Sequence, residues 1–247
     1  MEQKNMQNAV MQVILDRHST RAYRDEPITD EHKAMIFRAV RESPSAGNMQ
    51  TYSVIEIRDD EKARRLSVLC DNQPFIAQGK LLLLFVTNPL RYYDVYNETH
   101  EDKLNPTFAD LYLNINDALI AAQTAVLAAE SVGIGSCYIG DVIENYETVK
   151  EMFGLPKYVL PVCLLVMGYK TKEGISPKRF SEDDLFCVDT FQNDSFGAFA
   201  AKTGASPEEA RKQTEELVDR LFTRKMKAPF FAEMNRSLAV MLDDYLN

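Results

Sequence analysis

Hydrophobic and polar positions follow strand and helix periods along most of the chain, and this pattern predicts a layered fold. Two buried strands are expected at residues 80–87 and 159–168, because apolar runs such as LLLLFV need cover on both faces. The alternating stretch 52–57 and the short stretch 136–139 predict two more strands. Helical periods are predicted between and after the strands, at residues 5–17, 30–41, 59–69, 108–132, 144–153, 207–222 and 230–246. Helices that alternate with strands indicate an α/β or α+β fold.

Two stretches show neither period. Residues 92–105 contain two asparagines and many charges, so a surface excursion is expected there. Residues 169–204 are predicted to be irregular. Either residues 92–105 or residues 195–227 could close over a site, and the sequence leaves that choice open.

The longest helical pattern, at residues 108–132, has two apolar faces. The broad face holds many alanines, with Leu111, Ile115, Ala118, Leu119, Ala122, Ala125, Val126 and Ala129. The narrow face is spaced by sevens, at Leu113, Ile120 and Leu127. Two polar stripes separate these faces, one with Asn114, Asp117 and Thr124 and one with Asn116, Gln123 and Glu130. Such a helix lies either in the core of a large domain or against a second subunit, and the pattern alone leaves both open.

Composition and charge narrow the class of protein. The 247 residues are 45% hydrophobic and 26% charged, as in a globular protein. A net charge of −9 argues against nucleic acid or an anionic membrane as the main partner. The longest apolar run, residues 81–86, is far shorter than the roughly 20 residues of a membrane span. The polar start MEQKNMQNAV does not resemble a secretory signal, so a cytoplasmic protein is expected.

Metal and disulfide chemistry find little support in the sequence. Cys70, Cys137, Cys163 and Cys187 lie far apart, and none forms a zinc-type pair with a nearby cysteine or histidine. They are expected to be reduced and buried. Since no nucleophile elbow, carboxylate pair or set of His, Asp and Ser is visible, no catalytic side chain and no metal site are predicted.

Four segments could carry binding chemistry. The segment RHSTR, residues 17–21, places two guanidinium groups and two hydroxyls where a helix stops, which suits a phosphate monoester, although a solvated helix end is the alternative. SPSAGNMQ, residues 43–50, has the small residues and amides of a binding loop or of an ordinary turn. GIGSCYIGD, residues 133–141, is preceded by a helix and followed into a strand, so it is not a dinucleotide fingerprint. Lys178 and Arg179 could add positive charge to a pocket or be solvated.

Taken in this order, the segments resemble the nitroreductase-like family of FMN-dependent NAD(P)H oxidoreductases over at least residues 11–179. The stretch 118–169 resembles its flavin reductase and oxygen-insensitive nitroreductase branch. The resemblance implies an α+β, three-layer fold with a mostly antiparallel central sheet flanked by helices. It also implies a homodimer, with the long helix at the interface and the flavin between the subunits. Residues 1–194 would form the FMN-binding core, and residues 195–247 a helical extension packed on the core or on the partner subunit.

The resemblance also implies which residues bind the flavin. The RHSTR segment would contribute Arg17, His18, Ser19 and Arg21. The SPSAGNMQ loop, from the other subunit, would contribute Ser45, Asn48 and Gln50. Gln73 would meet the ribityl chain or the ring edge, and three main-chain groups would lie near the flavin N5 atom, at Tyr138, Ile139 and Gly140. Arg179 would reach the phosphate together with Lys178, although many relatives have Lys-Pro-Arg where this chain has Pro-Lys-Arg.

The implied activity is ping-pong hydride transfer through FMN, with NADPH or NADH as reductant. Nitroaromatics, quinones or free flavins would be the small-molecule acceptors. A cofactor that carries the reaction explains why no catalytic side chain is visible. Three other functions stay open at this point: a non-catalytic FMN-binding or storage protein, a flavin-free interaction dimer, and a dehalogenase or dehydrogenase of one small substrate.

Overall fold

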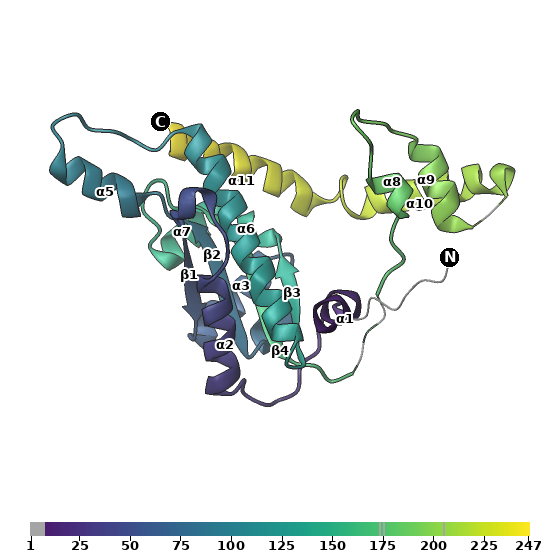
Figure 1. The fold of residues 1–247 in the computed structure, drawn as a ribbon, viewed down its shortest axis with the longest axis horizontal. Coiled ribbons are helices and arrows are strands. Elements are labelled where there is room, and N and C mark those ends of the chain that lie inside the picture. Colours follow the sequence, from purple (N-terminus) through teal and green to yellow (C-terminus); the bar gives the residue numbers. More distant parts are fainter. Residues whose placement is uncertain (1–7, 173, 175, 205) are drawn as a thin grey trace. The chain divides into compact units, whose positions relative to one another are not determined.

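The computed structural model describes residues 8–172, 174, 176–204 and 206–247, and the chain divides into two units (Figure 1). Unit 1 comprises Met1–Gly174 and Glu233–Asn247, and unit 2 comprises Ile175–Ala232. The predicted division at residue 194 into core and extension stays a prediction. No helix in the described ranges is both long and apolar enough to cross a bilayer.

An antiparallel sheet forms the centre of unit 1. Its strands are β1 (Tyr52–Ile57), β2 (Leu81–Thr87), β3 (Ile134–Ile139) and β4 (Pro161–Tyr169). Their order in the sheet is β1-β2-β4-β3, and each neighbouring pair is antiparallel. All four strands were predicted, and β3 begins two residues earlier than expected.

Strand β2 shows why this sheet has helices on both faces. Its side chains alternate between two clusters of buried residues, with Leu81, Leu83 and Phe85 in one and Leu82, Leu84 and Val86 in the other. Both faces of the strand are therefore dry, and a run without polar residues is the sequence that satisfies them.

Two layers of helices cover the sheet. Helices α2 (Asp30–Arg41) and α6 (Phe108–Glu130) lie side by side over one face (Figure 1). Helices α3 (Asp60–Leu69), α4 (Phe75–Gln78) and α7 (Tyr146–Phe153) contribute to the cluster on the opposite face. The expected α+β fold with three layers and an antiparallel centre is thus confirmed.

Helix starts follow the local sequence. Thr29 is the N-cap of α2 and accepts from the His32 main-chain N–H, while Thr107 and Asp110 form a capping box on α6. Helix α1 (Ala9–Asp16) begins at the Asn8 cap. The first residues of the helix predicted at 5–17, residues 5–7, lie outside the described residues.

Two predictions of irregular structure were wrong. Residues 92–105 include most of helix α5 (Leu90–Thr99), and residues 169–204 include α8 (Glu182–Leu185) and α9 (Ser195–Thr203). Helix α5 escaped detection because none of its residues is buried, so it carries no apolar stripe. It is attached through polar groups instead, with Tyr93 Oη donating to Asp110 Oδ2 at 3.0 Å.

The polar stripes of α6 were expected to lie apart from the core, and this was wrong for three of their residues. Asn114, Asp117 and Glu130 are buried. Glu130 is paired with Lys170 Nζ at 2.5 Å, which removes the cost of an isolated buried charge. Leu119, expected in the broad buried face, is 40% exposed. The narrow face is exposed at Leu113 and Ile120.

The chain ends in α10 (Pro207–Arg224) and α11 (Pro229–Leu246), both predicted. From Glu233 onward α11 belongs to unit 1, where Met241 and Tyr245 are buried in a third cluster. Arg236 pairs with Glu147 of α7 at 2.8 Å, and this contact lowers the pKa of the Glu147 carboxyl to about 2. Among the cysteines, the expectation of burial was wrong for Cys187, which is exposed.

Candidate functional site

The RHSTR segment is held against the end of the sheet. Helix α1 stops at Asp16, and the chain then runs beside β3, where Ser19 forms a parallel bridge with Ser136. The Thr20 main-chain N–H donates to Ser136 O at 2.9 Å. Further along, Tyr23 bridges with Lys170, just past β4. Both arginines of the segment are therefore carried by a backbone that is fixed to the sheet at two points.

Two glycines allow this close approach. Gly135 of β3 and Gly168 of β4 are opposite each other in the sheet register. A Cβ atom on Gly135 would lie 2.4 Å from Thr20 Oγ1, and one on Gly168 would lie 2.9 Å from the Tyr23 ring. Since real Cβ atoms do not approach so closely, only glycine lets the segment lie on this surface.

Arg17 and Arg21 both lie near Cys137 of β3. Burial raises the pKa of the Cys137 thiol, and the positive charges of Arg21 and Arg17 oppose that rise. The Arg21 guanidinium also lies 5.9 Å from the ring centre of Phe75, which the sequence reasoning missed. Neither arginine pairs with a carboxylate of the described residues. The two guanidinium groups thus remain available for an anion.

The other two predicted residues of this segment differ in exposure. Ser19 is exposed, whereas His18 is buried, with Nδ1 at 3.0 Å from Asp16 O. The backbone at Gly174 lies against the His18 ring, because a Cβ there would be 2.1 Å from its Cδ2 atom. The His18 ring is thus enclosed by its own chain.

Gln73 and residues 138–140 adjoin the end of β3. Gln73 Nε2 donates to Asp141 Oδ2 at 2.6 Å, and Asp141 directly follows Gly140. Around Gly140 there is free space, since no heavy atom lies within 4 Å of a Cβ built there. Ile139 is buried, and the half-buried Tyr138 donates through Oη to Gln123 Oε1 at 3.4 Å. The structure therefore brings these residues, Arg17, Ser19 and Arg21 to the same strand.

The predicted loop residues Ser45, Asn48 and Gln50 form a second group. The turn η1 (Ala46–Asn48) places Asn48 and Gln50 at positive φ. Within the loop, the Gln50 main-chain N–H donates to Ser45 Oγ at 3.0 Å, and Gln50 Nε2 donates to Arg41 O at 2.7 Å. In the described chain, no hydrogen bond or ion pair connects this loop with the arginine segment.

Asp117 of α6 holds the loop in place. Its carboxylate accepts from the Ala46 main-chain N–H at 2.9 Å and from Thr51 Oγ1 at 3.3 Å, and the side chain is buried. The sequence signal was present, because Asp117 lies in the polar stripe of a largely apolar helix. The pattern indicated a polar position and gave no sign of its partner.

Replacing Asp117 by alanine is expected to lower the free energy of unfolding by about 2 to 3 kcal/mol, because the buried Ala46 N–H and Thr51 hydroxyl lose their acceptor. Asp117→Asn keeps an acceptor oxygen and should lose about half as much. Urea unfolding followed by circular dichroism measures both. Equal stability of Asp117→Ala and the wild type would show that this carboxylate does not hold the loop.

Lys178 and Arg179 lie in unit 2, on exposed chain before α8. Their role at a phosphate stays a prediction.

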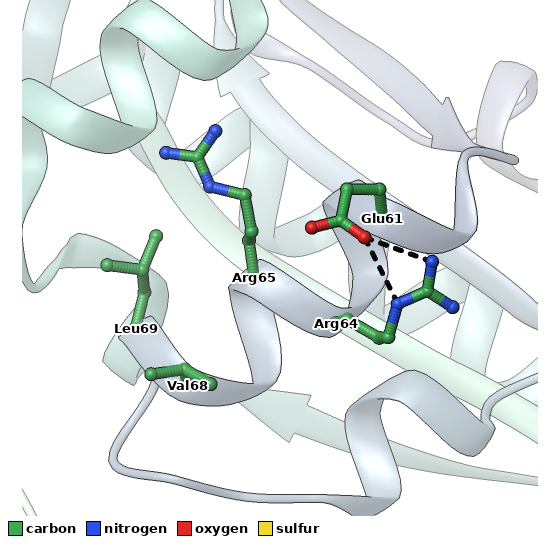
Figure 2. A pocket seen from close by; sticks show the side chains of 5 residues that line it. All are labelled: Glu61, Arg64, Arg65, Val68 and Leu69. Carbon is green, nitrogen blue, oxygen red and sulfur yellow. Dashed lines mark hydrogen bonds and ion pairs between the residues drawn. The ribbon is translucent and has the colours of Figure 1, made fainter.

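A surface pocket of about 290 Å³ lies elsewhere, on helix α3. All its lining residues come from this one helix: Glu61, Arg64, Arg65, Val68 and Leu69. Figure 2 shows Arg64 turned toward Glu61, to which it is paired at 3.0 Å, while Arg65 points the other way. None of the predicted site residues lines this pocket.

Glu144 is a buried carboxyl near the second end of this region. Burial raises its pKa to about 7, with smaller contributions from Asp141, Asp71 and Glu233. Its Oε1 atom finds no hydrogen-bond partner in the described part of the chain. Because the folded state holds this proton more tightly than the unfolded state, Glu144 favours folding below its unfolded pKa of about 4.5, and this contribution is lost as the pH rises to about 7.

The Glu144→Gln protein is therefore expected to be more stable than the wild type at pH 8, by about 1 to 2 kcal/mol, and equally stable near pH 4.5. Unfolding midpoints in denaturant at several pH values measure the difference. The exposed Glu151→Gln on α7 is the matched control and should show no such trend. A pH-independent difference between Glu144→Gln and the wild type would contradict the expectation.

Comparisons with known proteins cover most of the chain. The model of the Nitroreductase family matches residues 14–169. An FMN reductase (NAD(P)H) of Bacillus subtilis (strain 168) is 34% identical over 188 residues, which are 75% of this chain and 76% of that protein. An oxygen-insensitive NADPH nitroreductase of Salmonella typhimurium is 31% identical, over 64% and 65% of the two chains. The structure of the hypothetical oxidoreductase YcnD from Bacillus subtilis superimposes with a TM-score of 0.80, at 27% identity, over 95% of this chain and 98% of that one.

Proposed function

Because the chain belongs to the Nitroreductase family, we propose that it is an FMN-dependent NAD(P)H oxidoreductase that reduces nitroaromatics, quinones or free flavins. The observation that carries this proposal is the pair of guanidinium groups on Arg17 and Arg21. They lie beside one strand without a carboxylate partner among the described residues, in a chain with a net charge of −9. Such a pair suits the phosphate of FMN.

The residues along β3 fit FMN in their chemistry. Arg17, Arg21 and the Ser19 hydroxyl supply donors for a phosphate, and the free space at Gly140 leaves room for a flat ring. Gln73 supplies an amide for the ribityl chain or the ring edge. Main-chain N–H groups of residues 138–140 would stabilise negative charge on the ring, as donors in an oxyanion hole do.

When bound, FMN supplies hydride transfer between the nicotinamide and the acceptor. The chain itself then needs to bind, orient and stabilise charge. Arg17 and Arg21 would hold the phosphate end, while the close fit of residues 19–24 on the glycines keeps these side chains in place. NADPH or NADH and the acceptor would use the same position in turn.

We also propose that the active form is a homodimer. Helix α1 has no buried residue although it is largely apolar, with Val10, Ile14 and Leu15 exposed. On α6, Leu113 and Ile120 are 46% and 42% exposed. A second copy would cover these side chains and gain the free energy of their burial. It would also bring the loop with Ser45, Asn48 and Gln50 to the arginine segment of its partner, which the single chain does not do by hydrogen bonds.

The test is reduction of the bound flavin in the absence of oxygen. The purified protein should be yellow, NADPH or NADH should bleach it, and a nitroaromatic, a quinone or free flavin should restore the colour. A flavin that neither nucleotide bleaches would indicate a storage protein. A colourless dimer that takes up no FMN would indicate an interaction module. Comparison of kcat/KM for NADPH and NADH then gives the nucleotide preference.

A further inference from the structure

We propose that Asp141 is a positioning residue, which fixes the side-chain amide of Gln73 so that Gln73 offers the cofactor only a hydrogen-bond acceptor. The inference rests on the proposed function, since it places FMN beside Gln73 and Gly140. Asp141 begins the turn η2 (Asp141–Ile143) directly after β3 and Gly140. Its carboxylate thereby lies at the border of the candidate site, against a residue 68 positions earlier in the chain.

Both neighbours of the Gln73 amide can only accept hydrogen bonds. Nε2 donates to Asp141 Oδ2 at 2.6 Å and to the main-chain oxygen of Cys70 at 2.9 Å. A carboxylate and a carbonyl have no proton to give, so the opposite orientation of the amide would set Oε1 against two acceptors. The two bonds use both hydrogens of Nε2, and Oε1 is the polar atom left for a ligand.

The backbone around the amide is also held. The Gln73 main-chain N–H donates to Ser67 O at 2.7 Å, and Asn145 Nδ2 donates to Leu69 O at 3.2 Å. These contacts tie the end of α3 both to the Gln73 loop and to the segment that follows η2. The 2.6 Å separation of Nε2 and Asp141 Oδ2 is in the range of hydrogen bonds to a charged acceptor, which are about twice as strong as neutral ones.

The consequence is a stated polarity for this part of the site. The cofactor group that meets Gln73 must be a donor, and FMN offers two kinds, the imide N–H of the ring and the ribityl hydroxyls. Both share the same hydrogen-bond chemistry. FMN methylated at the imide nitrogen separates them, because it lacks the N–H and keeps the hydroxyls.

The experiment exchanges donor and acceptor between the two residues. Gln73→Glu places two carboxylates where the hydrogen bond was, and FMN binding to the flavin-free protein should weaken about tenfold or more. Asp141→Asn alone should change the Kd less than about threefold, because the asparagine oxygen still accepts. Adding Asp141→Asn to Gln73→Glu restores one donor and one acceptor in reversed order. The double variant should therefore bind FMN within about threefold of the wild type.

Recovery in the double variant is what a merely structural role of Asp141 would not produce. Binding by Gln73→Glu within twofold of the wild type, or no recovery on adding Asp141→Asn, would overturn the inference. Imide-methylated FMN assigns the donor: weaker binding than FMN identifies the ring N–H, and equal binding identifies a ribityl hydroxyl.

A second readout needs no flavin. In the nuclear magnetic resonance spectrum of the flavin-free protein, the two side-chain amide protons of Gln73 should be well separated, and Asp141→Asn should shift them more than Glu151→Asn does. An unaffected Gln73 signal would refute the contact itself. A protein that takes up no FMN, yet shows the expected amide shift, would instead contradict the proposed function and leave the orientation of Gln73 established.

Discussion

Replacing both Arg17 and Arg21 by alanine is expected to weaken FMN binding about 100-fold or more. A hydrogen bond to a charged group contributes about 1.5 to 3 kcal/mol, and each 1.4 kcal/mol is a factor of ten in Kd. The structure adds a reason for this large effect, because neither guanidinium is paired with a carboxylate in the described ranges, so nothing competes with the phosphate. Titration of the flavin-free protein with FMN, followed by flavin fluorescence, measures the change.

The matched control is Arg64→Ala on α3. Arg64 is also an exposed arginine, but it is paired with Glu61 and is not among the predicted site residues. Its removal should leave the Kd for FMN unchanged. The wild-type difference should also shrink at high salt, because added ions screen exposed charges. Full FMN content and unchanged affinity in the double alanine protein would make the phosphate assignment wrong.

Placing aspartates at Leu113 and Ile120 is the second change with a large expected effect. If a second copy covers this face of α6, two buried carboxylates without partners would cost several kcal/mol in the dimer and little in the exposed single chain. Sedimentation should then show a monomer. The same protein should lose most of its bound FMN, because the loop at residues 45–50 would no longer come from a partner.

Val68→Asp is the control for this change, since Val68 is 61% exposed and lies on α3, outside the α1 and α6 surface. It should leave both the oligomeric state and the FMN content as in the wild type. A Leu113→Asp, Ile120→Asp protein that still sediments as a dimer would refute this interface. A monomer that keeps its FMN would separate the interface from the site.

Patterns with a clear period predicted the framework well. The run LLLLFV gave β2 because a strand buried on both faces needs apolar residues at every position, and α6 was clear because its period extends over six turns. Helix α5 was missed because nothing in it is buried, and periodicity reports burial rather than backbone conformation. The burial of Asn114, Asp117 and Glu130 was missed for a related reason, since a polar residue can enter a core when a partner from elsewhere meets it.

The same limit applies to the candidate site. Arg17, Ser19 and Arg21 could be picked out because they are close in sequence and share one chemistry. Gln73 was assigned by resemblance, but its partner Asp141 was not, because 68 residues separate the two and the contact depends on how α3 and β3 end. Phe75 beside Arg21 was missed in the same way. A sequence names groups that can bind, while the fold decides which of them meet.

The glycine pair at positions 135 and 168 has one more consequence, which concerns aggregation. Strand β3 is the last in the sheet order, so one of its sides would offer unpaired main-chain groups to another chain. The segment with Ser19 and Thr20 occupies part of that side. A larger side chain at either glycine would push the segment away and leave an open strand edge, so a defect in flavin affinity and a tendency to form intermolecular β-structure should arise together.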